Sequence, residues 1–184
     1  IYIIFLFGCN MTIFEKANYL IETIEKAGFE AYQVGGCVRD FFMKRKCDDI
    51  DITTSAKPGD LEKILAENNI KYIETGLKHG TVTAVFDGDN FEITTYRTDG
   101  EYIDNRHPEN VSFVSNIDED LSRRDFTINA MAYNDTDGFV DEFKGLDDLD
   151  TKIIRCVGEP ELRFTEDALR MMRCLLYTSD AADD

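Results

Sequence analysis

The sequence is poor in basic residues and in proline, and it contains no tryptophan and only two histidines. Its 184 residues include 20 Lys and Arg against 37 Asp and Glu, which gives a net charge of −17 at pH 7. A protein of this charge lacks the basic field that holds nucleic acid nonspecifically, so contact with RNA requires local basic positions, metal ions or further protein. The three prolines and the 43% of apolar residues argue against a collagen-like or disordered chain and indicate a soluble globular protein.

The sequence also lacks paired cysteines and a long apolar run. Its five cysteines are scattered and form no Cys-x-x-Cys pair, which favours the reduced thiols of a cytoplasmic protein over a disulfide framework or a zinc site. The opening apolar run, residues 1–7, is too short to span a bilayer and follows no basic residue, so we expect no membrane association. Because Met11 directly precedes a helix start, we expect residues 1–11 to be an upstream or non-native leader.

Hydrophobic periodicity and turn residues divide the rest of the chain into short helices and strands. Thr12 and Glu15 form a capping box before a helix that Gly28 ends. The polar, aperiodic residues 98–110 predict a mobile loop. The other predicted elements are strands at 29–34, 49–53, 81–86, 91–96 and 153–157, helices at 37–43 and from Pro58, a helix that enters a strand over 121–133, and a short acidic stretch at 147–152.

A break at residues 158–160 marks a domain boundary. After it, Thr165 is predicted to cap a new helix with Glu166 and Asp167 in its first turn, where the helix dipole favours acids. We therefore expect an α/β domain over residues 12–158 and the start of a helical domain, cut off before it is complete, over residues 159–184.

Asp49 and Asp51 are candidate metal ligands. Alternate residues of a strand share a face, which places these two carboxylates on the same side with their Cα atoms roughly 6.5–7 Å apart. Magnesium prefers such oxygen ligands and keeps open positions for water and phosphate. An Asp-x-Asp pair alone is more often a solvated strand edge, and the sequence contains two further pairs in predicted turns.

A glycine pair upstream strengthens this interpretation. Gly35 and Gly36 lead from a predicted strand into a helix, where bare backbone N–H groups attract phosphate, and Arg39 adds further donors one turn later. Alone, the pair is an ordinary strand-to-helix turn. Ten residues ahead of Asp49 and Asp51, it makes a nucleoside triphosphate site plausible.

Four segments resemble, in order and in spacing, motifs of the CCA-adding enzymes and the related bacterial poly(A) polymerases; these segments are residues 34–40, 49–54, 123–132 and 166–170. The resemblance covers about residues 12–174. It implies an α/β nucleotidyltransferase head of the polymerase-β type, with a small mixed sheet flanked by helices, followed by a truncated all-helical neck. It further implies a magnesium-dependent transfer of CMP and AMP from CTP and ATP to the 3′ end of tRNA by a two-metal mechanism that releases pyrophosphate.

The resemblance also assigns roles to individual residues. Asp49 and Asp51 match the catalytic metal ligands, and residues 141–145 resemble the hinge between head and neck. Glu92 could supply a third carboxylate, although an exposed strand glutamate is the commoner case. The positions that match nucleotide-binding residues are Gly35, Gly36, Arg39, Arg123, Arg124, Asp125, Asn129, Asp167, Arg170 and Arg173.

Asp167 and Arg170 match the residues with which the family selects the base, and elementary chemistry agrees. Cytosine and adenine present an exocyclic amine beside a ring nitrogen acceptor, whereas uracil and guanine present a carbonyl beside an N–H. A carboxylate and a guanidinium three residues apart on one helix would therefore accept C and A and reject U and G, with Arg173 next on the same face. Without the upstream motifs, Asp-x-x-Arg would be read as a surface ion pair.

Departures from the family pattern leave alternatives open. Leu176 stands where the family has another arginine, and the second template motif of the neck, the body and the tail are absent from the sequence. Within the same class, a poly(A) polymerase or a CC- or A-adding enzyme remains possible, and whether CTP is used discriminates among them. From another class, the chain could be a non-catalytic nucleotide- or RNA-binding fragment. The sequence does not determine the oligomeric state.

Overall fold

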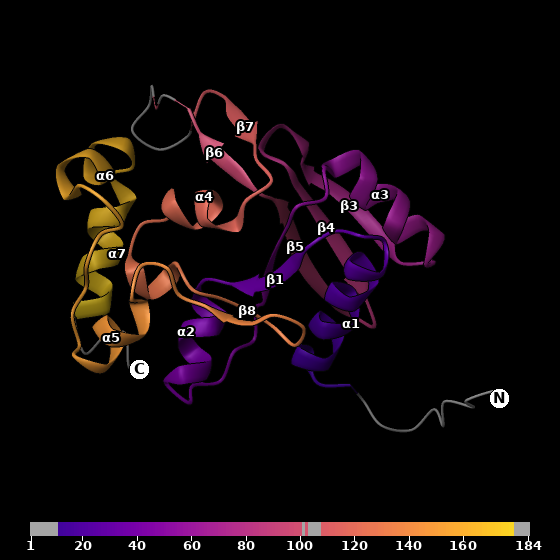
Figure 1. The fold of residues 1–184 in the computed structure, drawn as a ribbon, viewed down its shortest axis with the longest axis horizontal. Coiled ribbons are helices and arrows are strands. Elements are labelled where there is room, and N and C mark those ends of the chain that lie inside the picture. The colour runs from indigo at the N-terminus through magenta and orange to yellow at the C-terminus, as the bar shows by residue number, and fades with distance from the viewer. Residues whose placement is uncertain (1–10, 101, 103–107, 179–184) are drawn as a thin grey trace.

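The computed structural model describes residues 11–100, 102 and 108–178, and it contains a seven-stranded mixed sheet with helices packed around it (Figure 1). The strand order is β3-β4-β5-β2-β1-β8-β9, in which β2 and β5 are parallel and the other neighbours are antiparallel. The helices are α1 (Ile13–Lys26), α2 (Gly36–Phe42), α3 (Pro58–Glu67), η1 (Leu77–His79), α4 (Ile117–Ser122), η2 (Thr127–Asn129), α5 (Gly145–Asp150), α6 (Pro160–Glu166) and α7 (Leu169–Thr178). The strands are β1 (Ala31–Val34), β2 (Asp51–Thr54), β3 (Lys71–Gly76), β4 (Thr81–Phe86), β5 (Asp89–Thr95), β6 (Arg97–Asp99), β7 (Val111–Phe113), β8 (Ala132–Asn134) and β9 (Gly138–Val140).

One face of the sheet packs against α1 and α3 through the larger apolar core. The predicted capping box of α1 is confirmed, because the Thr12 hydroxyl accepts from the Glu15 backbone and the Glu15 carboxylate accepts from the Thr12 backbone. The apolar stripe of α1, including Leu20 and Ile24, is fully buried against alternate strand residues such as Ile93. Burial of these side chains is the main source of stability for this half of the molecule.

The opposite face is apolar only around β1 and β8. There a second core cluster contains Tyr32, Val34, Tyr96 and Leu121, so β1 is buried on both faces. Farther along the sheet, the same face is polar, and it carries Thr81 and Thr83 of β4 and Glu92 and Thr94 of β5. Thr81 and Glu92 of this stretch line one cavity together with Arg97 of β6 and with Asp167, which precedes α7.

Residues 98–110, expected to be a mobile loop, prove to be partly ordered. β6 pairs with β7 in a two-stranded ribbon, with Arg97 opposite Phe113 and Asp99 opposite Val111. The expectation was wrong for Thr98 and Asp99, because strands of three residues are too short to show alternation in the sequence. Residues 101 and 103–107 of the expected loop lie outside the described residues, as do residues 1–10 of the expected leader.

Other boundaries also differ from expectation. A helix that enters a strand was expected over residues 121–133, and the strand is present as β8, but α4 already ends at Ser122 and only a single 3-10 turn, η2, precedes β8. The strand expected at residues 153–157 is only an isolated bridge between Phe126 and Cys156. The acidic stretch at 147–152 forms most of α5, and β3 was not anticipated because its outward residues are largely exposed.

The helical segment after the head is broken, which corrects the expected helix start at Thr165. α6 begins with Pro160 in its first turn, and Asp167 leaves helical geometry with φ −139° and ψ 106° before α7 begins. The Asp167 carboxylate accepts from the Leu169 backbone N–H at 2.9 Å, so it caps α7 in place of continuing α6. Asp167 and Arg170 therefore do not lie on one continuous helix. None of the helices that the structure describes has the length and apolar character needed to cross a membrane.

Candidate active site

Asp49 and Asp51 lie where β2 begins, on the polar side of the sheet. The strand starts at Asp51 and not at Asp49 as expected, but the alternation holds, because Ile50 and Ile52 are buried while both aspartates are exposed. The parallel pairing of Ile52 with Ile93 places Glu92 beside Asp51 on the neighbouring strand. The structure thus brings a third carboxylate to this edge.

The environment of Asp51 disfavours its charged form. The carboxylate is open to solvent on one side and crowded by protein on the others, and this burial, together with repulsion from Asp49, raises its pKa to about 6. Arg124 opposes the shift and Glu92 adds to it. A bound divalent cation would reduce the repulsion among these carboxylates.

The donor set fits a hard cation that retains open positions. Asp49 and Asp51 offer oxygen ligands on one side, which suits magnesium completed by water and phosphate oxygens. Across residues 11–100, 102 and 108–178, no group of three or more His, Cys, Asp and Glu side chains is arranged to hold a metal ion. A cation bound by Asp49 and Asp51 would therefore take its remaining ligands from water and from phosphate oxygens of a substrate.

The glycine turn packs directly against an arginine. Gly35 has φ +82°, which favours glycine, and a Cβ added there would meet Nη1 of Arg124 at 3.2 Å. Arg39 lies beside the second glycine, because a Cβ added to Gly36 would meet its Nη2 at 3.6 Å. It donates to Asp40 at 2.9 Å and to the Asn129 carboxamide oxygen at 2.7 Å, and little of its side chain is exposed. Arg39 is thus fixed by protein partners.

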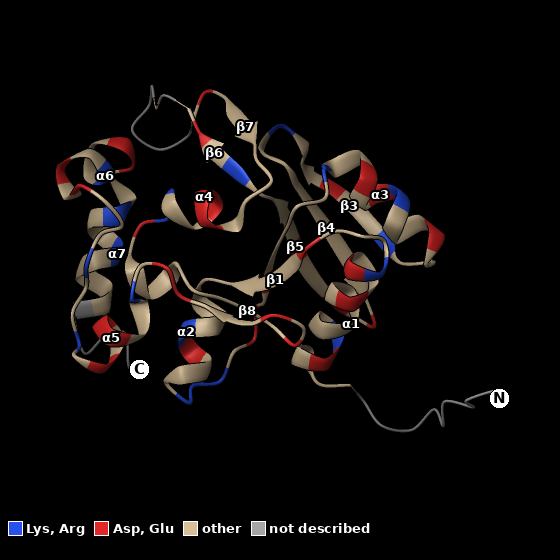
Figure 2. Cartoon of the chain, in the orientation of Figure 1, with Lys and Arg blue, Asp and Glu red and all other residues tan. Residues whose placement is uncertain are grey.

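A cavity of about 470 Å³ lies between the polar sheet face and the segment that leads into α7. Six of the candidate nucleotide-binding residues line it together; they are Arg123, Arg124, Asp125, Asp167, Arg170 and Arg173. Gly35, Gly36, Arg39, Asn129, Asp49 and Asp51 are not among the residues that line it. With Arg97 included, half of the ten arginines of an acidic chain line this one cavity, so the local charge differs from the net charge. Figure 2 shows basic segments on β6 and on α7, two of the elements that carry these arginines.

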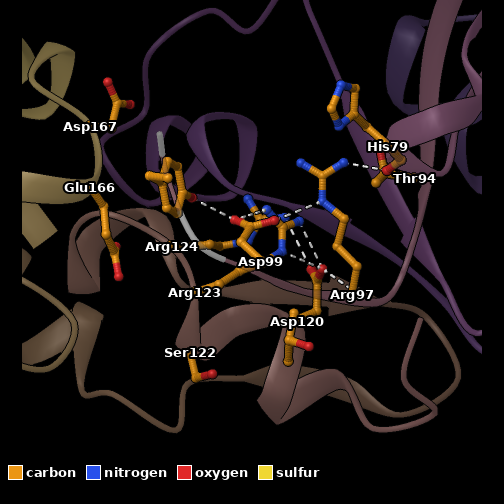
Figure 3. Close-up of polar contacts among 12 residues, drawn as sticks. His79, Thr94, Arg97, Asp99, Asp120, Ser122, Arg123, Arg124, Glu166 and Asp167 are labelled. Carbon is orange, nitrogen blue, oxygen red and sulfur yellow. Dashed lines mark hydrogen bonds and ion pairs between the residues drawn. The ribbon is translucent and has the colours of Figure 1, made fainter. Parts of the chain in front are cut away.

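Asp120 organises the arginine side of the cavity, and the sequence analysis missed it (Figure 3). Its fully buried carboxylate accepts from Arg123 at 2.8 and 3.0 Å, from Arg124 at 3.4 Å and from the Arg97 backbone at 3.2 Å. Burial opposes ionisation, but the two guanidinium groups outweigh it and hold the pKa of Asp120 below its usual value. The spacing of three and four residues to two arginines was the available signal.

Arg97 on β6 is the second residue that sequence reasoning missed. It lines the cavity, donates to the backbone oxygen of His79 and lies 3.3 Å from Asp99. Its buried Nε, like that of Arg124, has no hydrogen-bond partner among the described residues. Burial and the nearby Arg123 lower the pKa of Arg97, because the positive charges of the two guanidinium groups repel each other. This corner of the cavity therefore combines clustered positive charge with N–H donors that have no hydrogen-bond partner in the described part of the chain. Nothing in the local sequence indicates that Arg97 reaches the backbone of His79, which is 18 residues away.

The acidic residues of the cavity form a chain of hydrogen bonds from the head to α7. Asn129 donates to Asp125 at 3.1 Å, and Arg173 bridges Asp125 and Asp167 with 2.8 Å contacts to each. Asp125 and Asp167 are both buried. The structure therefore joins residues of the third and fourth motifs into one network.

Asp167 and Arg170 both line the cavity, yet they do not pair with each other. Arg170 donates to Glu166 at 2.6 Å and to the backbone oxygen of Arg123 at 3.3 Å, while Asp167 is held by Arg173. The surface ion pair that Asp-x-x-Arg usually forms is therefore not present. Each side chain is fixed from behind by other residues.

The mixed sheet, the carboxylates at the start of β2 and the arginine-lined cavity define a nucleotidyltransferase head of the expected mixed α/β class. A sequence profile of the poly A polymerase head domain matches residues 31–155. The chain belongs to this family, which confirms the family expected from its motifs.

Named relatives extend the comparison. The chain is 53% identical over 167 residues to the CCA-adding enzyme of Lactobacillus helveticus and 47% identical over 175 residues to that of Staphylococcus aureus. These alignments cover 91% and 95% of this chain but only 41% and 43% of those proteins, so the chain spans less than half the length of its relatives.

Solved structures are similar over the same extent. The CCA-adding enzyme of Bacillus stearothermophilus in complex with CTP matches with a TM-score of 0.81 at 44% identity, over 92% of this chain and 40% of that chain. The Thermotoga maritima CCA-adding enzyme complexed with tRNA matches with a TM-score of 0.72 at 28% identity, over 92% of this chain and 38% of that chain.

Proposed function

We propose that this protein is a cytoplasmic tRNA nucleotidyltransferase of the CCA-adding type, which transfers CMP and AMP from CTP and ATP to the 3′ end of tRNA and releases pyrophosphate. The observation that carries the proposal is the cavity in which Arg123, Arg124, Asp125, Asp167, Arg170 and Arg173 meet. The relatives crystallised with CTP and with tRNA support the choice of substrates. Residues 12–158 would form the head and residues 159–184 the start of the base-selecting helical domain.

Base selection follows from the groups that line the cavity. One oxygen of the Asp167 carboxylate caps α7 and the other accepts from Arg173, which leaves lone pairs for the exocyclic amine of cytosine or adenine. Arg170 would donate to the adjacent ring nitrogen. Uracil and guanine would present a carbonyl to the carboxylate and an N–H to the guanidinium, and both contacts would be repulsive.

The triphosphate would lie along Arg123 and Arg124, toward the glycine turn. The close approach of Arg124 to Gly35 supports this path, because it brings a guanidinium and bare backbone to the same place. Arg97, whose Nε has no hydrogen-bond partner among the described residues, would add positive charge on the β6 side. These groups hold the substrate while the tRNA hydroxyl attacks the α-phosphate in line with the leaving pyrophosphate.

Magnesium held by Asp49 and Asp51 would neutralise charge on the transferred phosphoryl group and on the leaving pyrophosphate. Arg39 and Asn129, bound to each other behind the glycine turn, would support the turn from below. Glu92 beside Asp51 would be a third carboxylate at this edge.

A poly(A) polymerase is the second candidate, favoured by the name of the family profile. Incubation of a full-length protein that contains this chain with magnesium, each labelled NTP and tRNA lacking its 3′ CCA distinguishes the two, since we expect residues 1–184 alone to extend tRNA little or not at all. We expect CMP incorporation followed by a single AMP, no UMP or GMP, and no product with tRNA whose terminal ribose has been oxidised. Long adenylate tails without CMP would favour the polymerase, and no incorporation of any nucleotide would favour a non-catalytic binding protein.

A further inference from the structure

The helical segment that carries Arg170 is interrupted, so its backbone alone does not fix the direction of α7. Asp167 adopts an extended conformation between α6 and α7, and only the two residues 167 and 168 separate the helices. A continuous helix would transmit its orientation through its own hydrogen bonds. Across this break, side-chain contacts must do so.

On the α6 side of the break, the side chain of Arg163 anchors α6 to the head. Its Nε donates to the backbone oxygen of Val157 at 2.7 Å, its Nη2 to that of Ser122 at 2.9 Å, and its Nη1 to the Glu166 carboxylate at 2.9 Å. Gly158, with φ +79°, lies directly against the guanidinium. One largely buried side chain thus joins the end of α4, the chain entering α6, and α6 itself.

Glu166 connects Arg163 to Arg170 through hydrogen bonds to both guanidinium groups. The same oxygen of Glu166 that accepts from Arg163 accepts from Nη1 of Arg170 at 2.6 Å, across the break in the helix. Arg170 also donates to the backbone oxygens of Arg163 at 3.1 Å and Arg123 at 3.3 Å, and only 6% of its side chain is exposed. Figure 3 shows Glu166 and Asp167 together on one side of the cluster, with His79 and Arg97 on the opposite side.

We propose that Arg163 is a positioning residue for base selection, which acts through Glu166 to hold the Arg170 guanidinium at the cavity. The inference rests on the proposed function, because it assumes that Arg170 reads the base. Arg163 does not line the cavity, so its effect on selection must pass through the residues that it holds. Recognition of a base edge depends on donor placement, and displacement by about an ångström removes most of its advantage.

The test is a double-mutant cycle on the ratio of kcat/KM for CTP to that for UTP, measured with tRNA lacking its 3′ end. We expect Arg163→Gln and Glu166→Gln each to lower this ratio by about tenfold. If Arg163 acts through Glu166, the CTP-to-UTP ratio of the double variant should be no lower than that of the more impaired single variant. Arg155→Gln is the matched control, because Arg155 pairs with Asp148 outside the cavity, and we expect its ratio to stay within about twofold of wild type.

Two results would overturn the inference: an unchanged ratio in Arg163→Gln, or losses in the double variant that equal the product of the single losses. If the glutamine variant loses its fold, Arg163→Lys decides, since it keeps the charge but cannot reach all three partners. We expect an intermediate loss of selectivity in Arg163→Lys, and an unchanged ratio would contradict the proposal. A wild-type protein that does not prefer CTP to UTP would instead overturn the proposed function itself.

Discussion

At the scale of single residues, the cavity depends on acids that hold its arginines in place. Asp120 is the clearest case, because one fully buried carboxylate accepts from two consecutive arginines and from the backbone of β6. Asp120 is fully buried and does not line the cavity, so it would not contact a substrate. Its contribution is to fix two guanidinium groups that would otherwise repel each other.

Asp120→Asn should lower the free energy of unfolding at pH 7 by about 2–3 kcal/mol, because it removes the carboxylate that two largely buried arginines share and, within the described residues, leaves only Arg123 with another acid, Asp99. The pKa of Asp120 is depressed in the folded state, so its stabilisation is present above its unfolded pKa of about 3.9 and is lost as pH falls through the folded value. Urea titrations of both proteins from pH 7 downward should therefore show the deficit shrinking in acid.

Asp60→Asn is the control for this prediction, because the Asp60 side chain is only half-buried and lies 3.9 Å from Lys63. We expect its unfolding free energy to stay within about 0.5 kcal/mol of wild type. A deficit in Asp120→Asn that grew toward acid pH would contradict the assigned charge of this carboxylate.

At the scale of elements, the sequence predicted what local patterns determine. The capping box before α1, the alternation that exposes Asp49 and Asp51, and the hairpin between β4 and β5 all depend on neighbours within a few residues. The break at Asp167 was not predicted, because Thr165 and Asp167 are both good helix-capping residues and the sequence does not decide between them. The contact of Asp120 with the backbone of Arg97, and that of Arg97 with the backbone of His79, could not be predicted, since each joins segments that are remote in sequence.

α5 illustrates how closely two elements approach. A Cβ on Gly145, at the start of α5, would lie 2.3 Å from the Thr127 backbone oxygen and 2.9 Å from Met131, so the backbone would have to move. We expect Gly145→Ala to lower the free energy of unfolding by about 2–4 kcal/mol, measured by urea denaturation.

Gly59→Ala is the matched change in α3, where an added Cβ meets nothing within 4 Å. We expect it to be neutral or to stabilise the protein by about 0.5–1 kcal/mol, because alanine favours a helix. Equal effects of the two substitutions would show that the approach of α5 to η2 is looser than described.

At the scale of the whole molecule, charge and apolar surface are unevenly distributed. The chain has a net charge of −17, yet half of its arginines line one cavity, while apolar side chains remain exposed on α6 and α7. Leu162, Leu169, Met171 and Met172 are 44–57% exposed. Apolar helix faces of this kind usually pack against further protein.

Residues 1–184 on their own should therefore self-associate through α6 and α7. We expect sedimentation velocity to show a weight-average mass that rises with protein concentration, and Leu169→Lys combined with Met172→Lys to suppress the rise. A monomer at every concentration would contradict this role of the exposed face.

The central claim is that the carboxylates at the start of β2 carry out nucleotidyl transfer, and the most direct test compares neighbouring aspartates. Asp48 is exposed and paired with Lys46, so Asp48→Asn makes the same chemical change one residue from the proposed ligands. We expect single-turnover transfer of CMP to tRNA in magnesium to be near wild type in Asp48→Asn and to fall by about a thousandfold or more in Asp51→Asn, with its fold retained. Transfer by Asp51→Asn within about tenfold of wild type would contradict the account.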